Sequence, residues 1–241
     1  MRLSPSKPDP LDPGPWGFAH RGLHSGAAVP ENSLAAFDAA IKFGAGIECD
    51  VRLSADGSAV VFHDINLKRV CDVALNVEQT AAALLKGQRL FGSDQCLPAL
   101  WRVLELVDGQ VPLLLELKTH NKNAARLCAE VVADLSPRSG AIGIMSFDPK
   151  VGWWLRRNAA HIVRGLVLGE GMPLLKRWLA MALVAPQFIA VHRACVGIAW
   201  VARIRDRMPV YAWTIRTAAE RSQASVHADA LIWESDGRPR N

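Results

Sequence analysis

Apolar runs and amphipathic stretches alternate along the chain from residue 16 onward. The apolar runs are short, and most are bounded by Gly, Pro or polar residues, which is typical of buried strands. Eight such strands are predicted, at residues 16–19, 47–53, 111–117, 142–146, 162–168, 188–191, 210–214 and 230–233. Because the runs lack a regular polar alternation, they indicate strands that are covered on both faces, as in a parallel sheet.

Between these runs, apolar residues recur with the period of a helix. The predicted helices cover residues 33–43, 97–107, 123–135, 149–158, 174–183, 196–207 and 217–225. Parallel strands need such helical crossovers, and eight of them close most naturally into a (β/α)8 TIM-type barrel. A doubly wound open sheet is the alternative α/β fold, but no GxGxxG motif follows the first predicted strand.

One stretch interrupts this alternation, between the second strand and the second main helix. It contains a small strand at 59–62, a short helix at 80–85 and much polar sequence. We therefore expect a single barrel domain over residues 16–241, with a small insertion at about 54–96 after the second strand. Insertions of this length at the end of a barrel strand are often functional. Residues 1–15 contain five prolines and are predicted to form a flexible N-terminal arm.

Composition narrows the class of protein further. Half of the 241 residues are hydrophobic and 21% are charged, which is enough for a large core. No uncharged apolar stretch reaches the roughly 18 residues of a membrane span, and the first residues do not resemble a secretory signal. The five cysteines form no CxxC pair, which favours buried thiols in a reducing cytoplasm. The net charge of +5 comes from scattered Lys and Arg, so we expect no nucleic-acid partner.

Acidic residues lie in two of the predicted strands. Glu48 and Asp50 are two residues apart and therefore point to the same face, and Glu116 lies near the end of the third strand. Barrel active sites lie where strands end, so the three carboxylates can converge there. Buried carboxylates need a cation, and an oxygen-rich cluster of this kind suits Mg²⁺ or Ca²⁺. The alternative is a lattice of salt bridges with Arg21, Arg52 or Lys118.

Two histidines also end strand-like runs in this half of the chain, His20 after the first strand and His63 after the small strand of the insertion. A histidine titrates near neutral pH, so a pair beside clustered acids is suited to be a general base and a general acid. Arg21 and Lys118 are then placed to hold an anionic group such as a phosphate.

Aromatic residues mark the ends of later strands. Phe147 and Trp213 could line a substrate pocket there, although a place in the hydrophobic core is an equally good interpretation for both. His192, at the end of the sixth strand, is a candidate for the pocket wall. The sequence therefore predicts a site built mainly from its first half, with an aromatic wall from its second half.

Several short motifs occur in a fixed order along the chain. They are Ala19-His20-Arg21-Gly22, Pro30-Glu31-Asn32-Ser33, Glu48-Cys49-Asp50-Val51, Asp56-Gly57 leading to Val60-Val61-Phe62-His63-Asp64, and Glu116-Leu117-Lys118. In this order they resemble the signature of the glycerophosphodiester phosphodiesterases. Ser146-Phe147-Asp148 and Trp213-Thr214 are similar to weaker later blocks of that family, so the resemblance extends over residues 16–233.

The resemblance implies a TIM-type barrel with an extra subdomain after the second strand. It implies a divalent metal held by Glu48, Asp50 and Glu116, with His20 and His63 as the acid–base pair. It further implies Arg21 and Lys118 as phosphate contacts, and a supporting role for Glu31 near His20 or Arg21.

Two departures from the family pattern lie near the C-terminus. The last strand of the family commonly ends in Thr-Asp before a proline, whereas here the sequence reads Trp233-Glu234-Ser235-Asp236-Gly237-Arg238-Pro239. Arg216 stands where the family commonly has Asn. We expect these changes to alter the outer contacts of the substrate and to leave the catalytic residues intact.

The expected function is hydrolysis of a glycerophosphodiester to an alcohol and glycerol 3-phosphate. One histidine deprotonates water or a neighbouring substrate hydroxyl, and the other protonates the leaving alkoxide, with His20 assigned as the base and His63 as the acid. Two alternatives remain: a lysophospholipase D-type reaction on lysophospholipids, and a barrel that binds a phosphorylated ligand without catalysis. The head group, the choice between Mg²⁺ and Ca²⁺, and the oligomeric state stay open at this stage.

Overall fold

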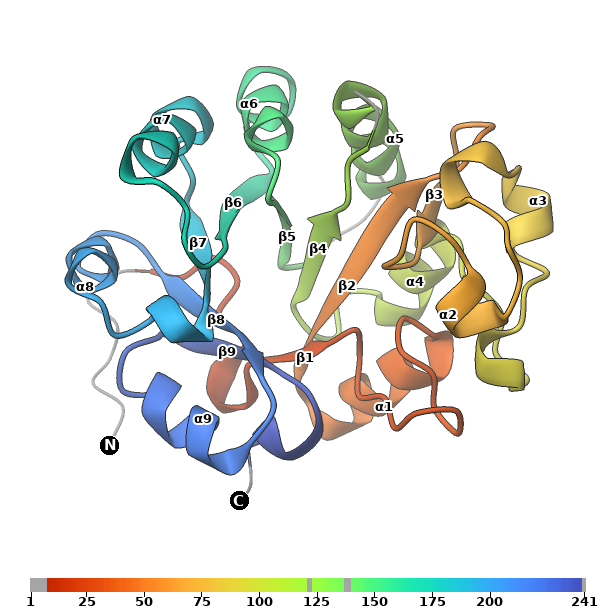
Figure 1. The fold of residues 1–241 in the computed structure, drawn as a ribbon, viewed down its shortest axis with the longest axis horizontal. Helices are drawn as coiled ribbons and strands as arrows, with labels where there is room; N and C mark the ends of the chain where they lie inside the picture. The colour runs from red at the N-terminus through yellow and green to blue at the C-terminus, as the bar shows by residue number, and fades with distance from the viewer. Residues whose placement is uncertain (1–7, 121–122, 137–139, 240–241) are drawn as a thin grey trace.

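The eight predicted barrel strands close into one parallel sheet in the computed structural model (Figure 1), which describes residues 8–120, 123–136 and 140–239. The strands are β1 (Phe18–His20), β2 (Gly46–Leu53), β4 (Leu113–Leu117), β5 (Ile142–Ser146), β6 (Val163–Leu168), β7 (Phe188–His192), β8 (Val210–Ile215) and β9 (Ala230–Trp233). Strand β1 pairs in parallel with β2 on one side and with β9 on the other, so the eight strands form a closed barrel. The predicted TIM-type barrel is therefore confirmed.

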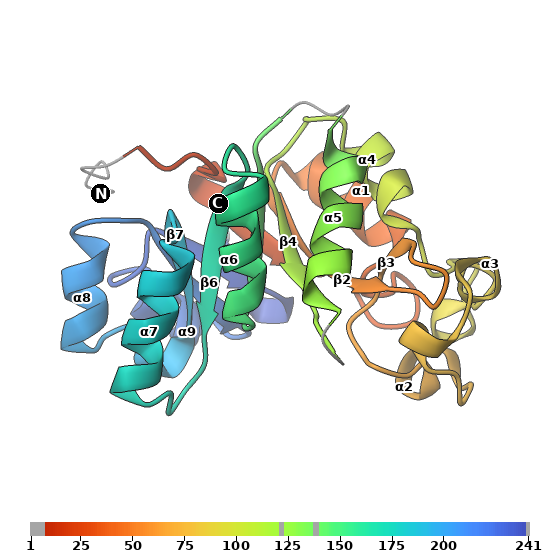
Figure 2. The same ribbon diagram turned by 90° about the horizontal axis from the view of Figure 1, so that it is seen from above.

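Helices follow the strands and form an outer ring, which Figure 1 shows around the strands, and Figure 2 shows α5, α6 and α7 along their length. They are α1 (Leu34–Phe43), α4 (Leu100–Val107), α5 (Ala124–Leu135), α6 (Pro149–Asn158), α7 (Leu174–Val184), α8 (Ala199–Arg205) and α9 (Ala218–Ala224). Helix α1 begins at the Ser33 cap and ends at Gly44, as its sequence predicts. Helix α4 starts three residues later than predicted, because Pro98 and Ala99 pair with the insertion instead.

The insertion packs beside the barrel on the right of Figure 1. It contains β3 (Ala59–Val61), which runs antiparallel to β2, and the short helices α2 (Lys68–Cys71) and α3 (Ala82–Leu85). A small hydrophobic cluster holds it together, including Phe62, Leu67 and Leu90. Because β3 runs antiparallel to β2, with Val61 opposite Val51, the chain returns along β2 and brings His63 back toward Asp50.

The inward faces of the strands change from apolar to polar along the barrel. Phe18 and Leu114 belong to an apolar cluster that fills one end of the interior. Two residues further along the same strands come His20 and Glu116, which share those inward faces because strand side chains repeat every second residue. The polar end is the one at which the strands finish, which is where active sites lie in enzymes with this fold.

Part of the predicted N-terminal arm closes the apolar end of the barrel. Residues 1–7 lie outside the described residues, so the prediction of a flexible arm stays untested there. Leu11, in contrast, is fully buried in the interior cluster, where a Cβ on Gly143 would clash with it. The hydroxyl of Tyr211 donates a hydrogen bond to Asp9 at 2.6 Å. This second half of the arm is therefore packed against the barrel.

Replacing Leu11 by Ala tests this closure. The substitution leaves a cavity at the end of the barrel, so we expect the free energy of unfolding to fall by about 2–5 kcal/mol. The matched control is Leu84→Ala, because Leu84 is 53% exposed and its loss should change stability by less than about 0.5 kcal/mol. Urea denaturation measures both, and equal small losses would show that the segment does not contribute to the core.

Candidate active site

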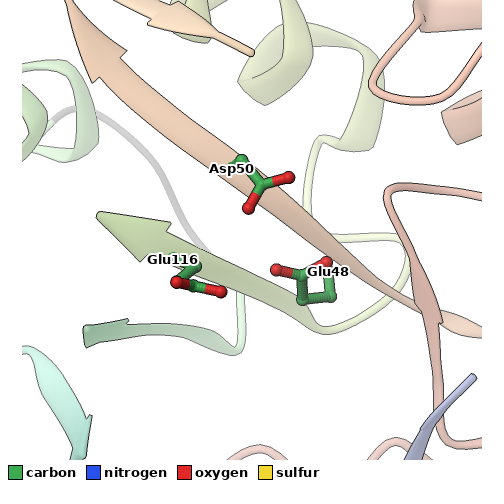
Figure 3. A group of neighbouring side chains, drawn as sticks. All are labelled: Glu48, Asp50 and Glu116. Carbon is green, nitrogen blue, oxygen red and sulfur yellow. The ribbon is translucent and has the colours of Figure 1, made fainter. Parts of the chain in front are cut away.

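Two neighbouring strands hold three buried carboxylates at the polar end of the barrel (Figure 3). Glu48 and Asp50 extend from β2, and Glu116 extends from β4. The strand register pairs Asp50 with Glu116, so these two side chains emerge side by side. One oxygen from each of the three carboxylates lies within 4.8 Å of the other two. The structure therefore brings the predicted acidic residues together.

Burial of this cluster opposes its negative charge. It raises the pKa of Glu48 well above the usual range, and the charges of Asp50 and Glu116 add to the rise. Burial likewise raises the pKa of Glu116, although Lys118 acts against it. Burial alone would raise the pKa of Asp50 too, but Lys118 and Arg21 outweigh it and hold that pKa below the ordinary value. The cluster is thus short of positive charge, mainly around the two glutamates.

The residues present fit a divalent metal. Oε1 of Glu48 is buried and has no hydrogen-bond partner among the described residues, which is costly for a carboxylate oxygen. Three carboxylates within reach of one point form the oxygen-rich donor set that hard divalent cations prefer. The cluster is therefore compatible with a divalent cation at the point where Glu48, Asp50 and Glu116 meet.

Two basic side chains already lie against the carboxylates. Nζ of Lys118 is 3.1 Å from Oδ1 of Asp50 and also donates to Glu116. Nε of Arg21 is 3.0 Å from Oδ2 of Asp50. The contacts predicted by the salt-bridge alternative thus exist for Lys118 and Arg21, yet they leave Glu48 without a cation on its free oxygen. Arg52 lies elsewhere and donates to the carbonyl of His63.

A tight loop after β1 positions Arg21. Its φ of 56° is in the left-handed region, and its backbone N–H donates to Oε2 of Glu48 at 3.1 Å. Asn32 also has a φ of 56° and donates its backbone N–H to the carbonyl of Arg21, which fixes the returning chain. Gly22 is required next to it, since its φ is 79° and a Cβ would approach Ala36 to 2.8 Å. The motifs around residues 20 and 32 therefore fold into one support.

His20 lies at the end of β1 and is held by a residue from the far end of the sequence. Its Nδ1 is 2.6 Å from Oε2 of Glu234, while its Nε2 points toward the acidic cluster, 4.0 Å from Oε2 of Glu48. Arg216 binds the other oxygen of Glu234 at 2.6 Å. Burial lowers the pKa of His20, although the hydrogen bond to Glu234 acts in the opposite direction. His20 is thus a buried imidazole with a fixed orientation.

His63 comes from the insertion and is the more exposed of the two histidines. Its Nδ1 is 2.7 Å from Oδ1 of Asp64. The other oxygen of Asp64, Oδ2, accepts a hydrogen bond from Nε of Arg69 at 2.7 Å. Burial lowers the pKa of His63, and the nearby charge of Asp50 opposes this. The two predicted histidines therefore lie on different elements, and both interact with the charge of Asp50.

Glu31 joins the two halves of this charge network. Its carboxylate accepts from Nη1 of Arg21 at 2.7 Å and from both terminal nitrogens of Arg69, at 2.7 and 3.0 Å. Charges of alternating sign thus run from Asp50 through Arg21, Glu31 and Arg69 to the partner of His63. The location agrees with the supporting place expected for Glu31 beside Arg21.

Aromatic side chains form the opposite wall. Phe147 is 41% exposed, and its ring meets that of Trp213 edge-on at 5.3 Å between centroids. Trp213 in turn meets the ring of His192 at 5.2 Å. Nζ of Lys118 is 5.8 Å from the Phe147 centroid, which connects this wall to the acidic cluster. The predicted pocket residues therefore lie beside the site, and Phe147 presents an open apolar surface.

Sequence reasoning missed the partners that orient the catalytic candidates. Glu234 was expected to affect only outer contacts, yet it contacts His20 directly. Asp64 belongs to the motif Val60-Val61-Phe62-His63-Asp64, but the sequence does not indicate its contact with His63. Nothing in the sequence except its charge indicates a role for Arg69. The departure from the family pattern at residues 233–239 was the one available pointer to Glu234.

Comparisons with known proteins agree with this geometry. Residues 20–235 match the model of the "Glycerophosphoryl diester phosphodiesterase family". A "Probable glycerophosphodiester phosphodiesterase 1" of Mycobacterium tuberculosis is 36% identical in an alignment 184 residues long, with 65% of this chain and 65% of the relative covered. The matched region thus spans about two thirds of that relative.

Solved structures share the fold. A phosphodiesterase from Oleispira antarctica, in complex with the product sn-glycerol-3-phosphate, superposes with a TM-score of 0.83 at 24% identity, covering 92% of this chain and 94% of the other. A protein described as a putative glycerophosphoryl diester phosphodiesterase from Silicibacter pomeroyi gives 0.81 at 23% identity, covering 94% and 93%. Since the family model covers nearly the whole barrel, the chain belongs to the glycerophosphoryl diester phosphodiesterase family.

Proposed function

We propose that this protein hydrolyses glycerophosphodiesters to an alcohol and glycerol 3-phosphate in a reaction that depends on a divalent metal. One observation carries the proposal: three buried carboxylates converge at the mouth of a family barrel, and two imidazoles on separate elements both lie close enough to interact with the charge of Asp50. A barrel that only binds a phosphorylated ligand would need neither histidine. A divalent cation held by Glu48, Asp50 and Glu116 would supply positive charge that stabilises the phosphate oxygens as the reaction proceeds.

Arg21 and Lys118 bind and orient the phosphate in this proposal. Both are largely buried, and burial opposes their charge, but Asp50 and the nearby glutamates outweigh it and raise the pKa of each side chain. Both therefore stay charged at neutral pH. The apolar face of Phe147 covers the substrate on the side of Lys118, where it excludes water from the phosphate.

His20 acts as the general base. A carboxylate can only accept hydrogen bonds, so Glu234 requires the proton of neutral His20 to be on Nδ1. The lone pair of Nε2 then points toward the acidic cluster, where it removes a proton from water or from a neighbouring hydroxyl of the substrate. The lowered pKa of His20 keeps this nitrogen unprotonated near neutral pH.

His63 acts as the general acid. When the oxygen that His20 has activated bonds to phosphorus, the bond from phosphorus to the leaving oxygen breaks, and Nε2 of protonated His63 gives its proton to that oxygen. Burial lowers the pKa of His63, so the protonated form depends on the opposing effects of the Asp50 charge and of Asp64, which accepts from Nδ1 and stabilises the protonated ring. The side chain of His63 is 35% exposed, so the alcohol leaves toward solvent. With water as the nucleophile, His20 then releases its proton to solvent and His63 takes one up. With the substrate hydroxyl as the nucleophile, the cyclic phosphate that forms is opened by water, which His63 deprotonates while His20 returns its proton to the leaving oxygen.

Mg²⁺ or Ca²⁺ is the proposed metal, since both prefer oxygen ligands.

No helix in the described ranges, 8–120, 123–136 and 140–239, is long and apolar enough to cross a membrane. The five cysteines are free, at positions 49, 71, 96, 128 and 195, which supports a reducing compartment such as the cytoplasm.

Removal of the metal tests the proposal. We expect a chelator to abolish release of glycerol 3-phosphate from glycerophosphocholine, and Mg²⁺ or Ca²⁺ to restore it. Glu116→Gln should weaken metal binding, followed by titration calorimetry, by at least about tenfold, because even partners outside the ligand shell contribute about 10–100-fold. The control is Glu105→Gln on the surface of α4, which should bind metal normally. Full activity in chelator would contradict the proposal.

The identity of the leaving group separates the two histidines. Each should contribute about 10²–10⁴-fold to kcat with glycerophosphocholine, so His20→Ala and His63→Ala lose that much. A p-nitrophenyl diester of glycerol 3-phosphate has a leaving group that needs no proton, so it should restore much of the kcat of His63→Ala and none of that of His20→Ala.

The exposed His161 offers the control for both variants, and His161→Ala should turn over both substrates normally. Rescue of His20→Ala by the p-nitrophenyl substrate, with no rescue of His63→Ala, would reverse the assignment of base and acid. Normal turnover in a folded His20→Ala protein would remove the mechanism altogether.

Glu234→Gln tests the orientation of His20. The amide keeps the size of the side chain but can also donate to Nδ1, which places the proton on Nε2 and removes the basic nitrogen from the site. We expect kcat to fall by up to the full contribution of a general base, about 10²–10⁴-fold, while KM and metal affinity change little. Steady-state kinetics and metal titration measure these, and a rise in KM with an unchanged kcat would assign Glu234 to substrate contact instead.

A further inference from the structure

Helix α7 presents a broad apolar face to solvent. Leu174, Leu175, Trp178 and Leu179 are 71%, 67%, 65% and 52% exposed, and Leu183 follows one turn later at 40%. On a helix of 3.6 residues per turn these positions cover about half of the circumference. Isolated exposed apolar residues are ordinary, but a contiguous group of this size marks a surface that meets a partner.

The inner face of the same helix is also apolar. Ala180 and Val184 are buried against the barrel, and Met181 packs on the main core. A helix that is apolar on all sides is normally buried on all sides. Packing against the barrel therefore accounts for only half of the apolar residues of α7, and the outer half remains unexplained by the fold.

Basic side chains border this apolar face. Lys176 is exposed on α7, and Arg156 and Arg157 of the adjacent α6 border a shallow hollow that also includes Trp153 and Leu183. The guanidinium of Arg157 lies over the ring of Trp153, 5.3 Å from its centroid. From residue 149 to residue 184 the sequence has six Lys and Arg but a single acid, Glu170. The surface is thus both apolar and positively charged.

The apolar face begins beside the mouth of the barrel. Helix α7 follows β6, so its first turn lies at the end where the strands finish. Gly169, the first residue after β6, lies against the exposed ring of Phe147, because a Cβ added to Gly169 would lie 3.6 Å from Cε1 of that ring. Figures 1 and 2 show α6, α7 and α8 side by side on this part of the outer ring. A partner on α7 would therefore lie next to the entrance of the site.

We propose that α7, with the adjacent part of α6, docks on the surface of an anionic lipid bilayer. Leu, Trp and basic residues together are the composition of helices that lie in the plane of a membrane interface. The apolar side chains of α7 enter the boundary between head groups and acyl chains, while Lys176, Arg156 and Arg157 contact anionic head groups. The docked barrel has its entrance near the bilayer surface.

Charge argues against a second copy of the chain as the partner. In a two-fold dimer the same patch lies on both subunits, so Lys176, Arg156 and Arg157 would face their own copies. The local sequence supplies only Glu170 to balance them, and this residue lies beside His192 instead. An anionic surface satisfies the charges and the apolar side chains together, whereas self-association satisfies only the latter.

The experiment is flotation of the full-length protein with vesicles. We expect it to bind vesicles of phosphatidylcholine with 30% phosphatidylglycerol, and to bind pure phosphatidylcholine more weakly. Trp178→Ser and Leu175→Ser should each reduce the partition coefficient about tenfold or more, because each removes a large apolar side chain from the bilayer. Lys176→Gln and Arg157→Gln should each reduce it about fivefold on the anionic vesicles, corresponding to about 1 kcal/mol per charge.

Two exposed apolar residues on other parts of the surface provide the controls. Trp101 on α4 is 41% exposed beside Arg102, and Val226 is 67% exposed in the turn before β9, so Trp101→Ser and Val226→Ser should bind vesicles normally. Glu48→Gln should bind vesicles equally well, which keeps this result independent of the proposed catalysis.

Three outcomes would overturn the proposal. One is absence of binding to any vesicle, and another is an equal loss of binding in the Trp101→Ser control. The third is a dimer, detected by sedimentation velocity, that Trp178→Ser dissociates while vesicle binding is absent or unchanged. That last result would assign the apolar face of α7 to contact between copies of the chain.

Discussion

Burial of three carboxylates at one end of a closed barrel is the constraint on which the site depends. Glu48, Asp50 and Glu116 stand on neighbouring strands whose register is fixed by the sheet, so they cannot separate to relieve their mutual repulsion. Removing such charges from water is strongly unfavourable unless cations meet them. Arg21 and Lys118 supply positive charge beside Asp50. Oε1 of Glu48 has no such partner among the described residues, and this uncompensated oxygen is what makes the cluster suitable for a metal.

The same constraint organises the residues around the cluster. A buried arginine that neutralises an acid must itself be held in place, and Glu31 and Arg69 extend the alternating charges toward His63. This continuity means that the insertion is not an independent addition to the barrel. It closes one side of the charge network, and it brings the more exposed histidine to the site from outside the ring of strands.

The part of the site that sequence predicted is the part encoded by spacing within single strands. Glu48 and Asp50 are two positions apart, which puts both on one face, and the apolar residues around them identified the strand. The contact between His20 and Glu234 spans 214 positions of sequence and exists only because β1 and β9 meet when the barrel closes. No local pattern encodes such a pairing. Arg69, on α2, binds Glu31 across 38 positions of sequence, so its place in the network was hidden for the same reason.

Helix α7 shows a related limit on the outside of the barrel. Its period predicted the helix at residues 174–183 almost to the residue, but a segment that is apolar on both faces cannot reveal which face meets the core. Only the packed barrel shows which face of α7 is buried, because helices of the outer ring contact the strands on one side and solvent on the other. A charged outer face would be solvated by water and would need no partner. The apolar half of α7 instead suits a less polar environment, and because the first turn of α7 lies at the end where the strands finish, the proposed bilayer contact lies beside the entrance of the site.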